Sequence, residues 1–128
     1  MAHDETVSVR YLVHDVEESI DFYTGLLGFE LGMSAAPAFA DVRRGNLRLL
    51  LSGPTSSAGR PMADGEMPSP GGWNRIHLGV DDLDREVRLL RDAGARFRND
   101  VVEGPGGRQV LLLDPSGNFV ELFQPAPR

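Results

Sequence analysis

The chain has 128 residues, the length of one ordinary domain, and 41% of them are hydrophobic, which is a globular composition. It contains no cysteine, which excludes disulfides, thiolate catalysis and cysteine-ligated metal sites. The net charge of −6 argues against a DNA or RNA partner, because proteins that bind nucleic acids carry basic surfaces.

The first half of the chain predicts a strand, a helix and three further strands. Val7 to Val13 is rich in β-branched and aromatic residues, which is typical of a strand. Asp15 then stands where it can cap a helix, whose apolar residues recur at helical spacing until Gly28. Arg44-Gly45-Asn46 is a hairpin turn signal. The three strands are expected at 29–34, 38–43 and 47–52.

The second half repeats this order. Arg75 to Val80 predicts a strand, and Asp82 caps a helix that ends at Gly94. The chain leaves that helix at 95–97, and strands at 109–113 and 119–123 flank a turn at Asp114 to Asn118. The glycines of Gly104 to Gly107 precede a strand and open no helix, so they indicate a turn and not a phosphate-binding loop.

The two halves also resemble each other in sequence. Val13-His14-Asp15-Val16 corresponds to Val80-Asp81-Asp82-Leu83, and Gly45-Asn46-Leu47 corresponds to Gly117-Asn118-Phe119. We expect one domain over 1–128, built from two β-α-β-β-β modules at about 6–52 and 73–124. A linker rich in Gly, Pro and Ser at 53–72 joins them and is expected to be irregular, because it has little to bury.

Two segments carry a resemblance to a known family. Asp15 to Phe29, and Leu112 to Leu122 with its Asp-Pro-Ser-Gly-Asn turn, resemble the vicinal oxygen chelate superfamily. That superfamily holds glyoxalases, extradiol dioxygenases, fosfomycin-resistance transferases and bleomycin-resistance binding proteins. The resemblance implies an α+β fold in which tandem modules form a cupped, incompletely closed, eight-stranded mixed barrel. It also implies a homodimer.

The resemblance places the family's metal ligands on the first and last strand of each module. Those positions are Ser8, Leu49, Arg75 and Glu121. A divalent transition metal needs about three His or carboxylate ligands, and only Glu121 qualifies. Arginine is a permanent cation that repels a metal ion. We therefore expect no metal and no cofactor. A site rebuilt from His77, Glu121 and water is the alternative.

In place of the metal we expect an ion pair between Arg75 and Glu121, because a guanidinium fits a carboxylate bidentately. Strand alternation puts His77 on the same face as Arg75. Arg10 is the counterpart of His77 in the first module. The alternative is that the ion pair only braces the sheet. The apolar wall around these groups is expected to hold Leu12, Leu47, Leu49, Leu51, Phe119 and Phe123.

These residues define the candidate site. The expected ligand-binding residues are Ser8, Arg10, Leu49, Trp73, Arg75, Phe119 and Phe123. Trp73 either stacks on a ligand or packs in the core or at a subunit interface. Glu121 with His77 is the one plausible acid–base couple, so these two are the candidate catalytic residues.

The favoured function is binding of a small hydrophobic or aromatic molecule without a metal. The alternatives are a glyoxalase-like lyase or isomerase or a dioxygenase-like enzyme, using a rebuilt metal site or Glu121 as base, and a non-catalytic structural or regulatory dimer. The expected partners are a small molecule and a second copy of the chain, with no nucleic acid and no membrane. No secretory signal or long apolar segment is recognisable, which predicts a cytoplasmic location.

Overall fold

The computed structural model describes residues 5–127, and His3 lies outside them. The chain divides after Gly71 into two compact units, each described below by itself. None of the helices within the described residues is long and apolar enough to cross a membrane.

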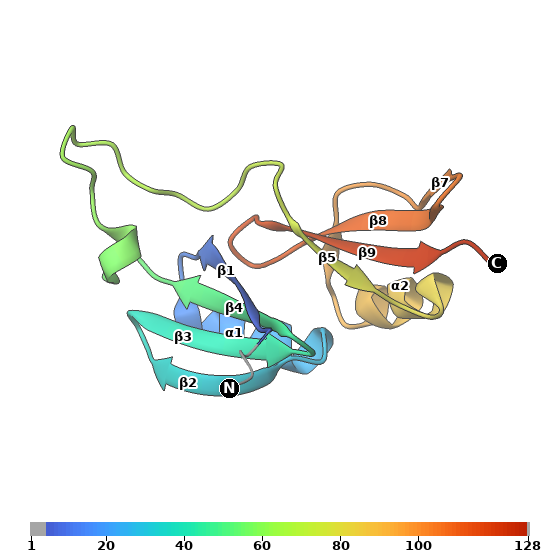
Figure 1. The fold of residues 1–128 in the computed structure, drawn as a ribbon, viewed down its shortest axis with the longest axis horizontal. Helices are drawn as coiled ribbons and strands as arrows, with labels where there is room; N and C mark the ends of the chain where they lie inside the picture. Colours follow the sequence, from blue (N-terminus) through green and yellow to red (C-terminus); the bar gives the residue numbers. More distant parts are fainter. Residues whose placement is uncertain (1–4, 128) are drawn as a thin grey trace. The chain divides into compact units, whose positions relative to one another are not determined.

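The first unit is a four-stranded sheet with one helix (Figure 1). Its elements are β1 (Val7–Leu12), α1 (Val16–Leu26), β2 (Glu30–Ala35), β3 (Phe39–Arg44) and β4 (Leu47–Ser52), followed by a 3-10 turn, η1 (Ser57–Gly59). The strand order is β1-β4-β3-β2. β1 runs parallel to β4, while β3 is antiparallel to both of its neighbours. This is the β-α-β-β-β order that the sequence predicts.

Local chemistry sets the bounds of α1. The Asp15 carboxylate accepts a hydrogen bond from the Glu18 N–H at 3.1 Å, which satisfies one of the unpaired donors at the helix start. After the helix Gly28 has a φ of 70°, a left-handed conformation that favours glycine. Tyr23 is fully buried on the inner face of the helix, edge-on to the rings of Phe22 and Phe29.

The register of β1, β4 and β3 determines which side chains share a face of this sheet. Val9 pairs with Leu49, and Leu49 pairs with Val42, so these three point to one side. Val42 and Leu49 are fully buried, and α1 packs on this side. The opposite side, which we call the Arg10 face, carries alternate residues of the same strands: Ser8, Arg10, Leu12, Phe39, Asp41, Arg43, Arg48, Leu50 and Ser52.

The second unit repeats the plan. Its elements are β5 (Ile76–Gly79), α2 (Leu83–Asp92), β6 (Arg96–Phe97), β7 (Val102–Gly104), β8 (Gly107–Leu113) and β9 (Phe119–Pro125), with the sheet order β5-β9-β8-β6. β6 and β7 pair with opposite ends of β8 and so share one place in the sheet. β7 was not predicted from the sequence. The α+β class and the tandem modules are confirmed.

The turn before β9 is held by one carboxylate. Asp114 is fully buried and accepts hydrogen bonds from the N–H groups of Ser116 and Asn118 and from Asn118 Nδ2, at 2.8 to 3.0 Å. Its own N–H donates to the Asn118 carbonyl. The turn therefore fixes where β9 begins, and with it the face on which Phe119 and Glu121 lie.

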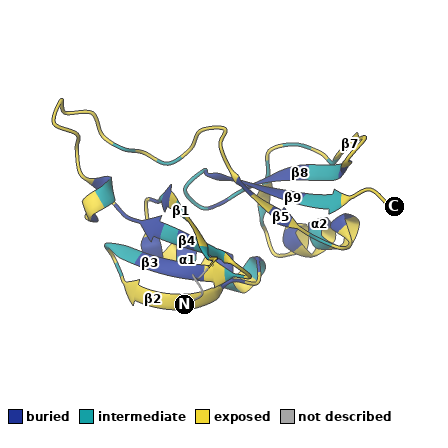
Figure 2. Cartoon of the chain, in the orientation of Figure 1, coloured by how far each residue is buried: buried dark blue, intermediate teal, exposed yellow. Residues whose placement is uncertain are grey.

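Burial follows these layers (Figure 2). β3, β4, β8 and β9 each have three or four buried residues, whereas every residue of the edge strand β2 is exposed. Between β4 and β5 the chain is irregular apart from η1.

Candidate functional site

The second unit contains the predicted ion pair. Arg75 Nε and Nη2 both donate to Glu121 Oε1, at 3.0 and 2.9 Å. The Glu121 side chain is 10% exposed and that of Arg75 is 29% exposed. A buried carboxylate needs hydrogen-bond donors and an opposite charge to offset its lost hydration, and Arg75 supplies both. Arg75 sits just before β5, while Glu121 lies in the middle of β9.

His77 reaches the second oxygen of the same carboxylate. It pairs with Glu121 in the β5–β9 register, which puts both side chains on one face of the sheet. His77 Nε2 lies 3.5 Å from Glu121 Oε2, which is long for a hydrogen bond. The imidazole is half-exposed and its centroid is 4.8 Å from that of Phe123. Glu121 thus has a guanidinium on one oxygen and an imidazole near the other.

Aromatic rings surround this polar group. Trp73 is 63% exposed, its ring centroid lies 5.0 Å from that of Phe119, and the Arg98 guanidinium lies 5.9 Å from the indole. The Trp73 carbonyl accepts a hydrogen bond from Arg75 Nη1 at 3.2 Å, which ties the tryptophan to the ion pair. The second unit therefore brings together Trp73, Arg75, His77, Phe119, Glu121 and Phe123, all of which were named from the sequence.

The first unit positions the other predicted residues. Ser8 and Arg10 are exposed and lie on the Arg10 face, and Arg10 Nη1 donates to Ser52 Oγ at 2.9 Å. Within its own sheet Arg10 pairs with Leu50, just as His77 pairs with Glu121 in the other sheet. Arg10 is therefore the counterpart of His77, as the repeat predicts.

The expected position of Leu49 is wrong. Leu49 is fully buried on the side that packs against α1, together with Leu51, and Leu47 shares that side through its pairing with Val7. The residue that corresponds to Glu121 is Leu50. The text match misleads by one residue because the turn after β3 has two residues and the turn after β8 has five, so equal spacing from the glycine does not give equal register. The residue at this position of the first module is still a leucine, Leu50, where the second module has the carboxylate Glu121.

The Arg10 face also carries a polar group that was not predicted from the sequence. Asp41 lies in the middle of β3 and is 3% exposed. Its oxygens accept from the Met33 N–H at 2.9 Å, Arg48 Nε at 3.0 Å and Arg43 Nε at 3.5 Å. The signal in the sequence was an acidic residue between two apolar residues, Ala40 and Val42, which are fully buried in the structure. An acid at this position of a half-buried strand must point to the other face and find partners there.

These donors do not fit a divalent transition metal. Glu121 and His77 are only two candidate ligands, and the cation Arg75 occupies one carboxylate oxygen. The equivalent positions in the first unit, Ser8 and Leu50, add no imidazole or carboxylate. Within residues 5–127 no three His, Asp or Glu side chains form a group that could hold a metal ion.

Comparisons with known proteins identify the family. The sequence profile of the glyoxalase/bleomycin resistance protein/dioxygenase superfamily matches residues 6–122. The chain is a member of this superfamily. Its fold is shared with a superfamily member from Sphaerobacter thermophilus, with 28% identity, a TM-score of 0.75, and coverage of 97% of this chain and 98% of that one.

Two further solved proteins with this fold have different roles. TnmS3, an antibiotic-binding protein from a Streptomyces species, is 25% identical with a TM-score of 0.71 over 98% of this chain and 99% of its own. A lactoylglutathione lyase from Agrobacterium tumefaciens is 22% identical with a TM-score of 0.71 over 92% and 91% of the two chains, a similarity of fold. The chain matches none of the curated proteins. One fold thus serves both a binding protein and an enzyme.

Proposed function

We propose that this superfamily member binds a small hydrophobic or aromatic molecule without using a metal ion. The observation that carries the proposal is the Arg75–Glu121 ion pair, in which two guanidinium nitrogens contact the one carboxylate at the family's ligand positions. A metal ion at Glu121 would have to displace Arg75, and would then face a charge that arginine cannot lose by deprotonation.

The surroundings of the ion pair support an aromatic or apolar ligand. Trp73, Phe119 and Phe123 offer ring faces beside Arg75 and His77, which can donate hydrogen bonds to an oxygen of the ligand. Apolar surface with a few oriented polar groups is the usual composition of a small-molecule site. TnmS3, which shares this fold, is an antibiotic-binding protein.

A second candidate function is acid–base catalysis. The 3.5 Å separation of His77 Nε2 and Glu121 Oε2 favours it, because a proton placed between them could be passed to or taken from a bound carbonyl compound. The same ion pair weighs against Glu121 as a base, since Arg75 already occupies one of its two carboxylate oxygens. We therefore rank binding above catalysis.

The test combines metal analysis with a binding measurement. Trp73 is the only tryptophan of the chain, so its fluorescence reports on ligands that approach the ion pair. We expect the purified protein to contain far less than one transition-metal ion per chain. We also expect 8-anilinonaphthalene-1-sulfonate to bind the protein and quench Trp73 emission. Its affinity should be the same before and after the protein is treated with EDTA.

Variants locate the binding. Arg75→Gln should weaken the binding of this probe, whereas Arg85→Gln, at an exposed position of α2, should not. Stoichiometric Zn, Fe, Mn or Ni in the protein, with binding that EDTA abolishes, would overturn the metal-independent reading. Turnover of an α-oxoaldehyde adduct of a thiol by the metal-free protein, lost in Glu121→Gln, would instead establish the catalytic alternative.

A further inference from the structure

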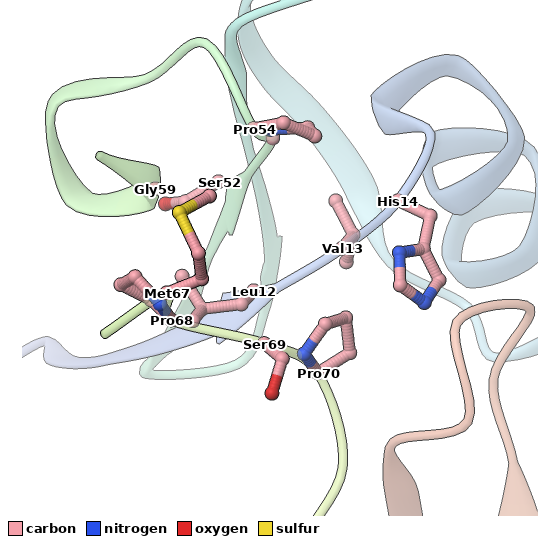
Figure 3. Close-up of a pocket in the computed structure, with 11 residues that line it drawn as sticks. Leu12, Val13, His14, Ser52, Pro54, Gly59, Met67, Pro68, Ser69 and Pro70 are labelled. Atoms are coloured by element: carbon pink, nitrogen blue, oxygen red, sulfur yellow. The ribbon is translucent and has the colours of Figure 1, made fainter. Parts of the chain in front are cut away.

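The first unit contains a pocket that the site described above does not use. It lies where β1 and β4 end and holds a cavity of about 160 Å³ (Figure 3). Leu12, His14 and Ser52 line it from the strand ends, and Met67 and Pro70 line it from the irregular segment that precedes the second unit. All of these residues belong to the first unit.

The size and lining of the pocket suit a single ring. A cavity of roughly 150 Å³ lined by apolar side chains is known to hold benzene. The walls here are mostly carbon, from Leu12, Val13, Pro54, Met67 and Pro70. In Figure 3 the Met67 side chain turns toward Ser52 and Gly59, and the Pro70 ring lies toward His14. Proline and methionine offer flat or adaptable apolar surface against which an aromatic ring packs well.

A cation lies beside this apolar pocket. Ser52 lines the pocket and is 1% exposed, and its Oγ accepts the hydrogen bond from Arg10 Nη1 at 2.9 Å. Arg10 lies on the same sheet face as Leu12, which also lines the pocket. A guanidinium has five N–H donors in a planar fork, and the bond to Ser52 uses one of them. Arg10 is exposed, so a carboxylate can reach the rest.

We propose that this pocket holds the ring of a small aromatic carboxylic acid while Arg10 binds the carboxylate. The proposal rests on the proposed function and deepens it, because it names the class of molecule and a position in the first unit where part of it binds. The discriminating features are a ring-sized apolar space and a cation one side chain away. A neutral aromatic alcohol could fill the apolar space but has no charge to pair with the cation.

The experiment is a pair of NMR titrations of the full-length, ¹⁵N-labelled chain with sodium benzoate and with benzyl alcohol. We expect benzoate to shift the amide signals of Leu12, Val13, Gly53 and Met67, and to bind about ten-fold more tightly than benzyl alcohol, as a charge-assisted hydrogen bond allows. Arg10→Gln should remove that preference and leave benzyl alcohol binding unchanged. Arg85→Gln is the matched control and should change neither.

A second pair of variants tests the pocket itself. Met67→Ala should weaken benzoate binding about four-fold or more, because part of the pocket wall is lost. Met62→Ala removes the same side chain from a position of similar exposure, 53% against 57%, outside the pocket lining, and should have no effect. Both methionines are exposed, so neither change should prevent folding.

The outcomes separate this inference from the proposed function. If benzoate shifts only signals around Ile76, His77 and Glu121, or if Arg10→Gln leaves its affinity unchanged, the inference is overturned while small-molecule binding stands. If the anilinonaphthalene sulfonate binds and benzoate does not, the inference is overturned in the same way. Failure of both probes overturns the proposed function as well.

Discussion

At the scale of single residues, Asp41 shows how this chain keeps a charge inside a sheet. Burial raises the pKa of the Asp41 carboxyl, but hydrogen bonds from Arg48 and from the Met33 N–H, the charge of Arg48 and a hydrogen bond from Arg43 outweigh it. The pKa of Asp41 therefore lies below its ordinary value of 3.8. Arg43 and Arg48 pair across β3 and β4, and Asp41 lowers the repulsion between them.

The Asp41→Asn variant should be less stable than the parent by about 1–3 kcal/mol near neutral pH, because two arginines lose a charged acceptor in a buried place. The folded-state pKa of Asp41 is below the unfolded one, so its contribution is present above about pH 3.8. That contribution is lost as the pH falls through the folded-state value. Denaturant unfolding between about pH 2.5 and 7 should show the two proteins converging at the acid end.

The control for this prediction is Asp84→Asn. Asp84 makes a bidentate pair with Arg108, at 2.9 and 3.1 Å, but its side chain is 58% exposed. Hydrogen bonding to Arg108 lowers the pKa of Asp84 as well. A surface pair is nevertheless screened by water and contributes little to stability. A loss at Asp84→Asn as large as the loss at Asp41→Asn would show that burial is not what makes Asp41 important.

At the scale of elements, β2 depends on a glycine. The β2–β3 register shifts between Leu31 and Ser34, and Gly32 lies in this irregularity. A Cβ atom added at Gly32 would come within 2.5 Å of Asp41 Oδ2, a carboxylate that Arg48, Arg43 and the Met33 N–H hold in place. The missing side chain is therefore what lets the Asp41 carboxylate sit against β2.

We expect Gly32→Ala to destabilise the protein by about 1–3 kcal/mol, since either β2 or the Asp41 carboxylate must move. Gly25→Ala provides the opposite case. Gly25 lies in α1, and nothing stands within 4 Å of an added Cβ, so alanine should raise stability by up to about 1 kcal/mol through its helix propensity. Thermal unfolding of both variants checks this, and a neutral Gly32→Ala would show that the edge strand yields freely.

The elements also show how far sequence reasoning reaches. Asp15 and Asp82 were identified as helix caps, and each accepts the hydrogen bond that a cap requires. The ion pair could be predicted because the resemblance puts Arg75 and Glu121 at two of the family's ligand positions, and strand alternation puts His77 on the face of Arg75. The face of Leu49 could not be predicted by matching the repeats, because hairpin loops of different length change the register. β7 has three residues, all exposed, so it leaves no hydrophobic pattern to detect.

At the scale of the whole molecule, the chain is a tandem repeat with one polar site per half. Each unit carries its helix on one side of its sheet and its candidate functional residues on the other. The halves have diverged in charge. The first has arginines around one buried aspartate, and the second has a single arginine on a glutamate. We propose that the two units act as one domain over 1–128, because each alone has few residues with which to build a core.

The remaining prediction concerns assembly. β2 is the edge strand of its sheet, all of its residues are exposed, and it presents Leu31 and Met33 at 49% and 53% exposure with only one charged residue. An exposed apolar edge of this kind can pair with a strand of another chain. We therefore expect a homodimer that uses β2, and light scattering at micromolar concentration should give twice the chain mass of 14.0 kDa.

A charge at this edge should separate the copies. Met33→Lys adds a charge that an incoming strand would have to bury, so it should shift the mass toward 14.0 kDa at the same protein concentration. Leu89→Lys is the matched control, because Leu89 is an apolar residue of similar exposure, 54%, on α2 in the other unit. A mass of 14.0 kDa for the parent protein would show that the predicted homodimer is wrong. A dimer that Met33→Lys leaves intact, with circular dichroism unchanged, places the interface away from β2.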